Sequence, residues 1–425
     1  MPLHLNSILW TRSQIDRLTA GTWLSGGSVD WLATGVRREP QHVAAGDLFI
    51  TAGPVGREVV TSDVNQLFAR GAVAVITSVP PTTNVLWGPV RLVADTNQVY
   101  EALAADSLSR NTTQIVAVTG SVGKTGTKDA IAHVLSHQGT VLSNPRSANS
   151  DTVILELLCQ LAPNVDYAIA ELGMLGPHSI TRKAALCQPH VAVITSINAA
   201  HRKHHRSDIS IAETKSEILD GIRPGGTAVL PRDSSFFEYL LKRAEAQSNI
   251  KRVLTFGRHT DADVRLVKQS SHADSTDVEI DCCGQQLCYR VGLPGGHHAL
   301  NSLAVWAVVS ALGADSTLAA MSLSSLPPTF RRCERFRVER PEGVCEVIDD
   351  SWNASPESVA AAIELLSRRP IPAGGRRVLI LGDMLELGPN ERALHRSLAE
   401  PINSGNIDIV FTAGDLTREL HDALP

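Results

Sequence analysis

Short apolar runs alternate with stretches of helical spacing along most of the chain. Near the N-terminus, Asp47–Thr51 and Ala72–Ile76 have the pattern of strands, and Val64–Arg70 between them has that of a helix. Ser, Asn and Thr cluster over Ser107–Thr113, which is typical of a linker. The pattern therefore predicts a small N-terminal α/β domain over residues 1–110.

The alternation continues with Gln114–Thr119, a buried-strand pattern that leads into a Gly-rich turn and a helix. Further apolar runs follow at Tyr167–Ala170, Val191–Thr195, Gly226–Leu230 and Val253–Phe256. Helix-like stretches, including Ile211–Gly221, separate most of them. Strands that alternate with helices predict a parallel, doubly wound sheet, here in a central domain over residues 111–326.

A second linker is expected around Ser322–Phe330, where two prolines lie among Ser and Thr. Beyond it, apolar runs at Val344–Ile348, Arg377–Leu381 and Ile407–Thr412 alternate with helical stretches. They predict a third α/β domain, of Rossmann-like type, over residues 327–425. The expected fold class is thus α/β, with three domains and a doubly wound parallel sheet in the central one.

Composition narrows the possible functions. A chain of 425 residues with 43% apolar and 20% charged residues is typical of a globular protein with more than one core. The net charge of -5 gives no general reason to bind nucleic acid, and no apolar run is long enough to cross a bilayer. Seven scattered cysteines and no secretory signal favour a reducing cytoplasm. We expect a cytoplasmic protein.

The clearest chemical motif is the Gly-rich turn between the strand at Gln114–Thr119 and the following helix. Glycines let backbone N–H groups approach an anion, and the start of a helix favours negative charge. In this reading Lys124 contacts the β- and γ-phosphates of ATP, and Thr125 binds Mg²⁺. Val118 replaces the first glycine of the common motif, so a turn that binds nothing is the alternative. The expected ATP-binding residues here are Gly120, Ser121, Val122, Gly123, Lys124, Thr125, Gly126 and Thr127.

Two further residues follow predicted strands where metal ligands would be needed. Glu171 comes directly after a strand, and His201 follows the strand at Val191–Thr195. Either could instead be polar surface. His204 and His205 extend the second group, but no cysteine pair completes a zinc site, so a basic loop is the better interpretation. Ordinary thiols are also the better interpretation of Cys282, Cys283 and Cys288.

Six ordered motifs resemble the Mur ligases, and most closely their MurF branch, the UDP-N-acetylmuramoyl-tripeptide–D-alanyl-D-alanine ligases. The motifs are TGSVGKTGTKDAI at 119–131, AELGMLG at 170–176, ETKSEIL at 213–219, PGGHHALNSLA at 294–304, DDSWNASPESV at 349–359 and LGDMLELG at 381–388. The resemblance implies an ATP-dependent ligase that joins a carboxylate to an amine through an acyl-phosphate, with ADP and phosphate released. The implied reaction adds an amino acid or a dipeptide such as D-Ala-D-Ala to a UDP-MurNAc-peptide.

The resemblance also implies roles for single residues. Thr125 and Glu171 would hold one Mg²⁺, and His201 would help to hold a second. Lys215, otherwise an exposed helical lysine, matches a lysine that CO₂ carbamylates into a metal ligand. The catalytic set is then Lys124, Glu171, His201 and Lys215. His297 and Asn301 match residues on the adenine side of ATP, and Arg335, Asp350 and Asn353 match residues of the third domain that close over ATP. Asp383 and Glu386 match residues that chiefly shape that domain.

Departures from the family pattern concentrate where acceptors are chosen. Thr34-Gly35-Val36-Arg37 stands in place of a Thr-Asp-Ser-Arg-like stretch, and only Asn149 fits an expected Asn-Asn pair. Ser196 replaces an Asn. A ligase diverted to another acid and amine in a specialised pathway therefore stays beside peptidoglycan synthesis as an alternative. A non-catalytic nucleotide-binding partner protein is a further alternative, which the presence of Lys124, Glu171 and Lys215 disfavours. A P-loop motor or switch is another, which Glu171 and the third domain disfavour.

Overall fold

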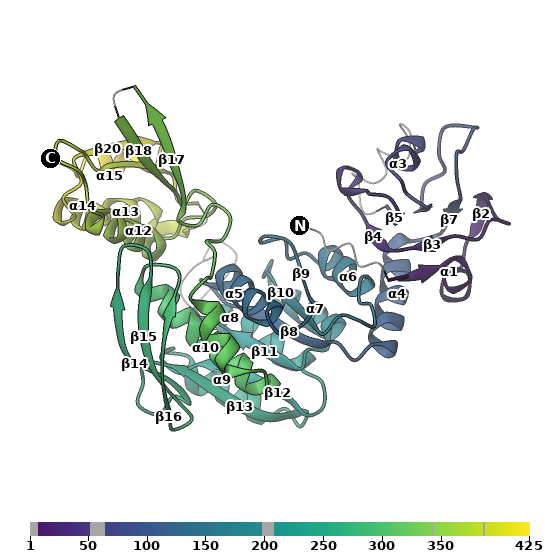
Figure 1. Cartoon of the computed structure of the whole chain (residues 1–425), viewed down its shortest axis with the longest axis horizontal. Helices are drawn as coiled ribbons and strands as arrows, with labels where there is room; N and C mark the ends of the chain where they lie inside the picture. The colour runs from purple at the N-terminus through teal and green to yellow at the C-terminus, as the bar shows by residue number, and fades with distance from the viewer. Residues whose placement is uncertain (1–6, 52–63, 198–207, 342, 386) are drawn as a thin grey trace. The chain divides into compact units, whose positions relative to one another are not determined.

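The structure is a computed structural model that describes residues 7–51, 64–197, 208–341, 343–385 and 387–425. Its internal contacts define two compact units. The first comprises residues 1–116, 139–172 and 182–189, and the second comprises residues 117–138, 173–181 and 190–425. The domain boundaries after residues 110 and 326 stay predictions. Figure 1 shows the order of the elements along the chain.

The N-terminal part of the first unit is built on a five-stranded sheet with the order β2-β7-β6-β5-β4. Strands β4 to β7 pair in parallel, and β2 pairs antiparallel with β7. Residues 48–50 and 74–76 are fully buried, as expected for parallel strands that are covered on both faces. The strands are β2 (Thr22–Ser25), β4 (Gly35–Arg37), β5 (Asp47–Ile50), β6 (Ala74–Thr77) and β7 (Val90–Leu92). The predicted strand–helix–strand order is confirmed, with α3 (Asn65–Ala69) between β5 and β6.

Two capped helices join this sheet to the rest of the first unit. Helix α4 (Thr96–Arg110) begins after Asp95, whose side chain accepts from the Asn97 amide, and α6 (Asp151–Cys159) begins after Ser150 in the same way. The two helices pack together. The indole of the fully buried Trp10 donates to the Cys159 carbonyl at 2.9 Å. The same part of the unit contains β1 (Trp10–Thr11), α1 (Arg12–Leu18), β3 (Leu32–Ala33) and the short helix η1 (Pro40–His42).

A mostly buried carboxylate on α6 contacts the N-terminal sheet region. Glu156 Oε2 lies 3.1 Å from Arg38 Nε, and Arg37 donates to Gln160 Oε1 at 2.6 Å. Burial raises the pKa of Glu156 to about 7, although Arg38 and Arg37 oppose the shift. This carboxyl group therefore changes its charge within the physiological pH range.

The central sheet has nine strands in the order β16-β15-β14-β13-β12-β11-β8-β10-β9. Strand β8 begins in the first unit, together with β9 and β10, and ends in the second, together with β11 to β16. The neighbouring pairs β9–β10, β11–β12, β12–β13 and β13–β14 are parallel, which confirms the predicted parallel character. The strands are β8 (Gln114–Thr119), β9 (Val141–Ser143), β10 (Tyr167–Glu171), β11 (Val191–Ile194), β12 (Gly226–Pro231), β13 (Ile250–Gly257), β14 (Val264–Ser271), β15 (Thr276–Cys282) and β16 (Gln285–Val291).

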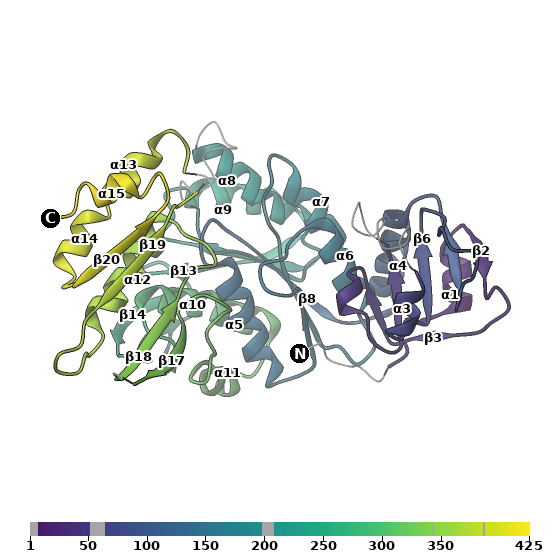
Figure 2. The ribbon, with the colours of Figure 1, turned by 90° about the horizontal axis from the view of Figure 1, so that it is seen from above.

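The last strands of this sheet reverse direction. Strand β15 pairs antiparallel with both β14 and β16, a meander that the sequence pattern did not predict. Helix α10 (Gly296–Leu312) returns across β13 to β15 and packs against α5 (Lys124–Ser136), as Figures 1 and 2 show. Helix α8 (Asp208–Ser216) continues as the 3-10 helix η3 (Glu217–Gly221) and lies beside α9 (Phe237–Glu245) in Figure 2. The predicted helix at Ile211–Gly221 thus changes from α to 3-10 geometry after Ser216. The remaining helices are α7 (Ser179–Cys187) and α11 (Ser316–Leu323).

The C-terminal region combines a hairpin with a small parallel pair. Strands β17 (Glu334–Arg340) and β18 (Gly343–Asp349) form an antiparallel hairpin, while β19 (Val378–Gly382) and β20 (Ile409–Ala413) pair in parallel. All three predicted strands are present, but β18 pairs with β17 and not with the parallel pair. The helices are α12 (Pro356–Arg368), η4 (Gly388–Asn390), α13 (Glu391–Arg396), α14 (Ala399–Ser404) and α15 (Arg418–His421). Their apolar faces share a core with β19, centred on Ile363 and Leu420.

Within the described part of the chain, no helix has both the length and the apolar character that a membrane span requires. The candidate functional residues named from the sequence lie mainly in the segments that follow β8, β10 and β11.

We predict that Glu156→Gln makes the protein relatively more stable as the pH rises from 5 to 8. A carboxyl group whose pKa is raised on folding stabilises the protein below its unfolded pKa, and this contribution is lost as the pH passes through the folded pKa of about 7. The glutamine has no such titration. At about 1.4 kcal/mol per pKa unit, the difference reaches at most about 3 kcal/mol. Thermal midpoints of both proteins across this range measure it.

Glu238→Gln on α9 is a suitable control, because it makes the same substitution at an exposed position. A difference between Glu156→Gln and the wild type that stays constant with pH would contradict the prediction.

Candidate functional site

The chain leaves β8 through a loop that only glycine can form at two positions. Gly120 has a φ of 152°, and a Cβ there would lie 2.0 Å from Thr195 Oγ1. Gly123 has a φ of 84° immediately before α5, and a Cβ there would lie 2.8 Å from Asn301 Oδ1. Both positions exclude a side chain for reasons of space and of backbone conformation. The strand, Gly-rich loop and helix predicted from the sequence are therefore all present, as β8, the loop after it and α5.

The loop is held from one side by the residues that follow β11. The Thr195 hydroxyl donates to the Val122 carbonyl at 2.6 Å, and the Ser196 hydroxyl accepts from the Val122 amide at 3.0 Å. The Ser121 amide donates to the Ser196 carbonyl at 2.8 Å. Sequence reasoning missed these supports, since Thr195 was assigned only to a strand. The available signal was a pair of hydroxyl residues directly after a buried strand.

Two lysine side chains converge on the Gly120 carbonyl oxygen. Lys124 Nζ and Lys215 Nζ each donate to it at 2.8 Å, and Lys124 also reaches the Ser121 carbonyl at 3.2 Å. The structure thus brings together the phosphate-loop lysine and the lysine of the ETKSEIL motif, which are 91 positions apart in sequence.

Lys215 lies at the end of α8 and is only 1% exposed. An exposed helical lysine, which was the alternative, is excluded. Burial lowers the pKa of Lys215 well below its usual value, and the nearby Lys124 charge lowers it further. The side chain of Lys215 therefore loses its proton more readily than that of a surface lysine.

The start of α10 lies against the same loop. The Asn301 amide is next to Gly123 and Gly126, where added Cβ atoms would lie 2.8 and 3.7 Å from it. His297 is exposed at the start of this helix and packs on His298, with ring centroids 4.0 Å apart. Of the two residues predicted for the adenine side, Asn301 thus reaches the loop, and His297 lies one helical turn before it on α10.

Glu171 ends β10 in the first unit. Its side chain is buried, with 1% of the residue exposed, so a solvated loop residue is excluded. Its amide donates to Asn144 Oδ1 at 2.8 Å, and its Oε1 accepts from Asn149 Nδ2 at 3.0 Å. Asn149, the one residue that fits the expected Asn-Asn pair, therefore contacts the predicted metal ligand directly.

Part of the predicted site lies outside the described residues, namely His201 with its neighbours His204 and His205, and Glu386. Among the residues that the structure describes, no three or more His, Cys, Asp and Glu side chains gather in a way that could hold a metal ion by themselves.

The residues predicted to close over ATP belong to the C-terminal region. Arg335 on β17 donates to the Asp274 carboxylate and, at 3.0 Å, to the Ala273 carbonyl in the β14–β15 turn. Asp350 accepts from the Cys333 amide at 3.2 Å, and burial raises its pKa to about 6. Asn353 is exposed. Asp383 accepts from the amides of residues 416 and 417, as expected for a residue that shapes this region.

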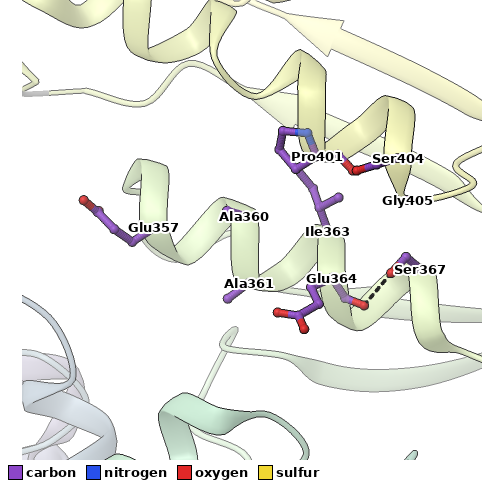
Figure 3. A pocket seen from close by; sticks show the side chains of 9 residues that line it. All are labelled: Glu357, Ala360, Ala361, Ile363, Glu364, Ser367, Pro401, Ser404 and Gly405. Carbon is purple, nitrogen blue, oxygen red and sulfur yellow. Dashed lines mark hydrogen bonds between the residues drawn. The ribbon is translucent and has the colours of Figure 1, made fainter.

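A cavity of about 490 Å³ lies between α12 and α14 (Figure 3). Its polar side chains are Glu357, Glu364, Ser367 and Ser404. Both serine hydroxyls already donate to carbonyls of their own helices, at 2.8 and 3.0 Å. A cavity that offers two carboxylates and no cation is unsuited to phosphate, so the candidate site is the loop after β8.

Comparison with known proteins identifies the family. Residues 118–309 match the Mur ligase middle domain, and residues 331–425 match the Mur ligase glutamate ligase domain. The UDP-N-acetylmuramoyl-tripeptide–D-alanyl-D-alanine ligase of Bacillus subtilis strain 168 is 33% identical over 390 residues, which cover 91% of this chain and 80% of that protein. The chain belongs to the Mur ligase family. The resemblance found in its motifs is thereby confirmed.

Solved structures agree with this result. MurF from Acinetobacter baumannii is 25% identical, with a TM-score of 0.81 over 98% of this chain and 88% of that one. The MurF ligase from Thermotoga maritima in complex with ADP is 24% identical and similar in fold, with a TM-score of 0.71 over 91% of this chain and 86% of that one. This Mur ligase is an ATP-dependent enzyme that forms amide bonds, as its motifs predicted.

We predict that Gly123→Ala lowers ATP-dependent ADP release about 100-fold, because displacing a positioned group by about 1 Å can have an effect of that size. The alanine would have to keep the positive φ of Gly123, which L residues rarely adopt. Its Cβ would also collide with Asn301. Steady-state ADP release measures the effect.

Gly126→Ala, three positions along, is the matched comparison. Its Cβ would make only ordinary contacts, 3.7 Å from the Asn301 amide, inside α5. Alanine at a helical position stabilises by up to about 1 kcal/mol, so this variant should fold and lose far less activity. Equal losses in the two variants would show that the clash at Gly123 is not the cause.

Proposed function

We propose that this Mur ligase adds D-alanyl-D-alanine to a UDP-N-acetylmuramoyl-tripeptide in peptidoglycan synthesis. The observation that carries the proposal is the 33% identity to the Bacillus subtilis ligase of that name along 91% of the chain. Relatives of the same name in Escherichia coli and Mycobacterium tuberculosis are 29% and 28% identical. The proposal also includes that the enzyme is a cytoplasmic monomer and that its substrates are small molecules. Free thiols at all seven cysteines, each within the described residues, support a reducing compartment.

The reaction requires a good leaving group, since a carboxylate does not react with an amine at neutral pH. Attack of the substrate carboxylate on the γ-phosphorus of ATP forms an acyl-phosphate and releases ADP. The amine, as its free base, then attacks the acyl carbon, the C–O bond to phosphate breaks, and an amide forms. In this proposal the Lys124 ammonium stabilises charge on the phosphates, and its contact with the Gly120 carbonyl in the loop after β8 supports the role.

Magnesium ions belong to this proposal through the residues that would hold them. Thr125 and Glu171 would bind one Mg²⁺, and His201 would help to bind a second. Buried oxygen donors suit Mg²⁺: Thr125 is 4% exposed, and the Glu171 carboxylate accepts from Asn149. When bound, Mg²⁺ neutralises phosphate charge and orients the phosphates.

Carbamylation of Lys215 is part of the same proposal. Only the neutral amine attacks CO₂, so that an N–C bond forms, a proton leaves and the cation becomes an anion. Burial and the Lys124 charge lower the pKa of Lys215 and so favour the neutral form. The proposal further assigns His297 and Asn301 to the adenine side of ATP, and Arg335, Asp350 and Asn353 to closure of the C-terminal region over it.

We predict that ADP release from ATP requires both the UDP-MurNAc-tripeptide and D-Ala-D-Ala, and that Lys124→Ala abolishes it. The variant loses the ammonium group that donates to the Gly120 and Ser121 carbonyls of the loop. A coupled ADP assay with each substrate omitted in turn measures this. Retained ligation in Lys124→Ala would show that the loop is misassigned.

A ligase diverted to another acid or amine is the second candidate, and one observation favours it. Arg37, the residue that matches the family's acceptor stretch, is engaged inside its own unit. Its Nε lies 3.3 Å from buried Asp47 Oδ2, and its Nη1 donates to Gln160. ADP release that the UDP-MurNAc-tripeptide does not support, but another acid and amine do, would favour this candidate.

We predict that removing CO₂ and bicarbonate lowers the ligation rate of the wild type, and that restoring bicarbonate recovers it. Lys215→Ala should be at least about tenfold slower, because losing a group that orients a metal site has an effect of this size, and it should not respond to bicarbonate. Rates in degassed and bicarbonate-supplemented buffer at constant pH test both statements. A wild type that is indifferent to bicarbonate would count against carbamylation.

A further inference from the structure

Glu217, the second residue after Lys215, is a buried carboxylate with an unusual set of partners. Its Oε1 accepts from the His178 amide at 2.6 Å, and its Oε2 accepts from the amides of Ile180 and Thr181, both at 3.0 Å. The residue is 8% exposed. Three backbone donors therefore stabilise a charge that would be costly to bury alone.

These donors lie at the start of α7, which begins at Ser179. The first amides of a helix have no partner inside the helix, and its N-terminus attracts negative charge. Glu217 supplies this partner from a distant part of the chain. It also fixes His178, which has a φ of 62° and a side chain that is 89% exposed, in a conformation uncommon for a residue with a Cβ.

Lys215 at the end of α8 and Glu217 at the start of η3 make contacts on opposite sides of the junction between these two helices. Two residues along a helix correspond to a rotation of about 200°, so their side chains point in nearly opposite directions. Lys215 donates to the Gly120 carbonyl at 2.8 Å, while Glu217 binds the amides of residues 178, 180 and 181. The junction between α8 and η3 is thus fixed between the phosphate loop and the start of α7.

We propose that Glu217 is a positioning residue that keeps Lys215 at the phosphate loop by binding the N-terminus of α7. Without the carboxylate, the junction loses its fixed point on the side away from the loop, and the Lys215 nitrogen no longer has a defined place. The inference rests on the proposed function insofar as Lys215 contributes to metal binding there. Glu217 itself touches no reacting group.

The test compares Glu217→Gln with the wild type in two measurements over a range of Mg²⁺ concentrations. One is the ligation rate, and the other is the rise of the thermal midpoint caused by ATP without an acceptor. In both, we expect the Mg²⁺ concentration at half-maximal effect to increase about tenfold, the lower end of the range for residues that orient metal ligands. A purely structural role would reduce the amount of folded enzyme and the midpoint itself, but would not move this concentration.

Asp220→Asn is the matched control. Asp220 lies on the same 3-10 helix and is also a carboxylate, but it accepts from Arg243 at 2.8 Å and from Gln247 at 2.6 Å on the α9 side. It should keep the wild-type Mg²⁺ dependence. An unchanged Mg²⁺ dependence in Glu217→Gln, or an equal change in Asp220→Asn, would overturn the inference.

The ATP measurement separates this inference from the proposed function. A wild type that ATP and Mg²⁺ stabilise, but that does not ligate D-Ala-D-Ala, would refute the proposed substrates, while the shift in Glu217→Gln would still decide the role of Glu217.

Discussion

Two lysine nitrogens share one carbonyl oxygen in the loop after β8, and like charges this close repel each other strongly in a poorly hydrated place. Lys124 and Lys215 both donate to Gly120. Because Lys215 is buried, the arrangement is most favourable when that lysine is neutral or when an anion arrives. ATP phosphates bring such an anion. Conversion of Lys215 to a carbamate would reverse its charge and turn repulsion from Lys124 into attraction. The same contact therefore connects nucleotide binding with the chemistry proposed for Lys215.

This arrangement needs a loop that does not move when charge arrives. Thr195 and Ser196 bind the loop backbone at Val122, and the space around Gly120 and Gly123 leaves no room for a side chain. Donors that are already in place need not be reorganised when charge develops on a phosphate, and such preorganisation is a large source of catalysis in phosphoryl transfer. The rigidity comes from the end of β11 and from α10 together, so the site depends on packing between elements that are far apart in sequence.

Features that depend on residues close together in the sequence could be predicted, whereas those that depend on distant residues could not. The strands at β5, β8 and β10 are short apolar runs beside turn residues, which is a local signal, and the phosphate loop is a contiguous motif. The β14–β16 meander was missed because its strands mix buried positions with exposed polar ones such as Lys268 and Arg290, so that no continuous apolar run marks them. The contacts of Lys215 and Glu217 are equally hidden, since their partners lie 95 and 36 to 39 positions away. Recognition of the family supplied a role for Lys215 but none for Glu217.

The stretch Thr34–Arg37 departs from the family pattern, and its contacts show that this departure involves more than one residue. Gly35 stands where the family's stretch has an Asp, and a Cβ at this position would lie 2.0 Å from Asp47 Oδ1. Asp47 is itself held by the Ala44 amide at 2.8 Å and by Arg37. A side chain at position 35 therefore requires Asp47 to move, and moving Asp47 releases Arg37. Gly35, Asp47 and Arg37 form one packed group, so a change at one of them affects the other two. A single substitution toward the family stretch at position 35 would therefore disturb the packing of all three residues.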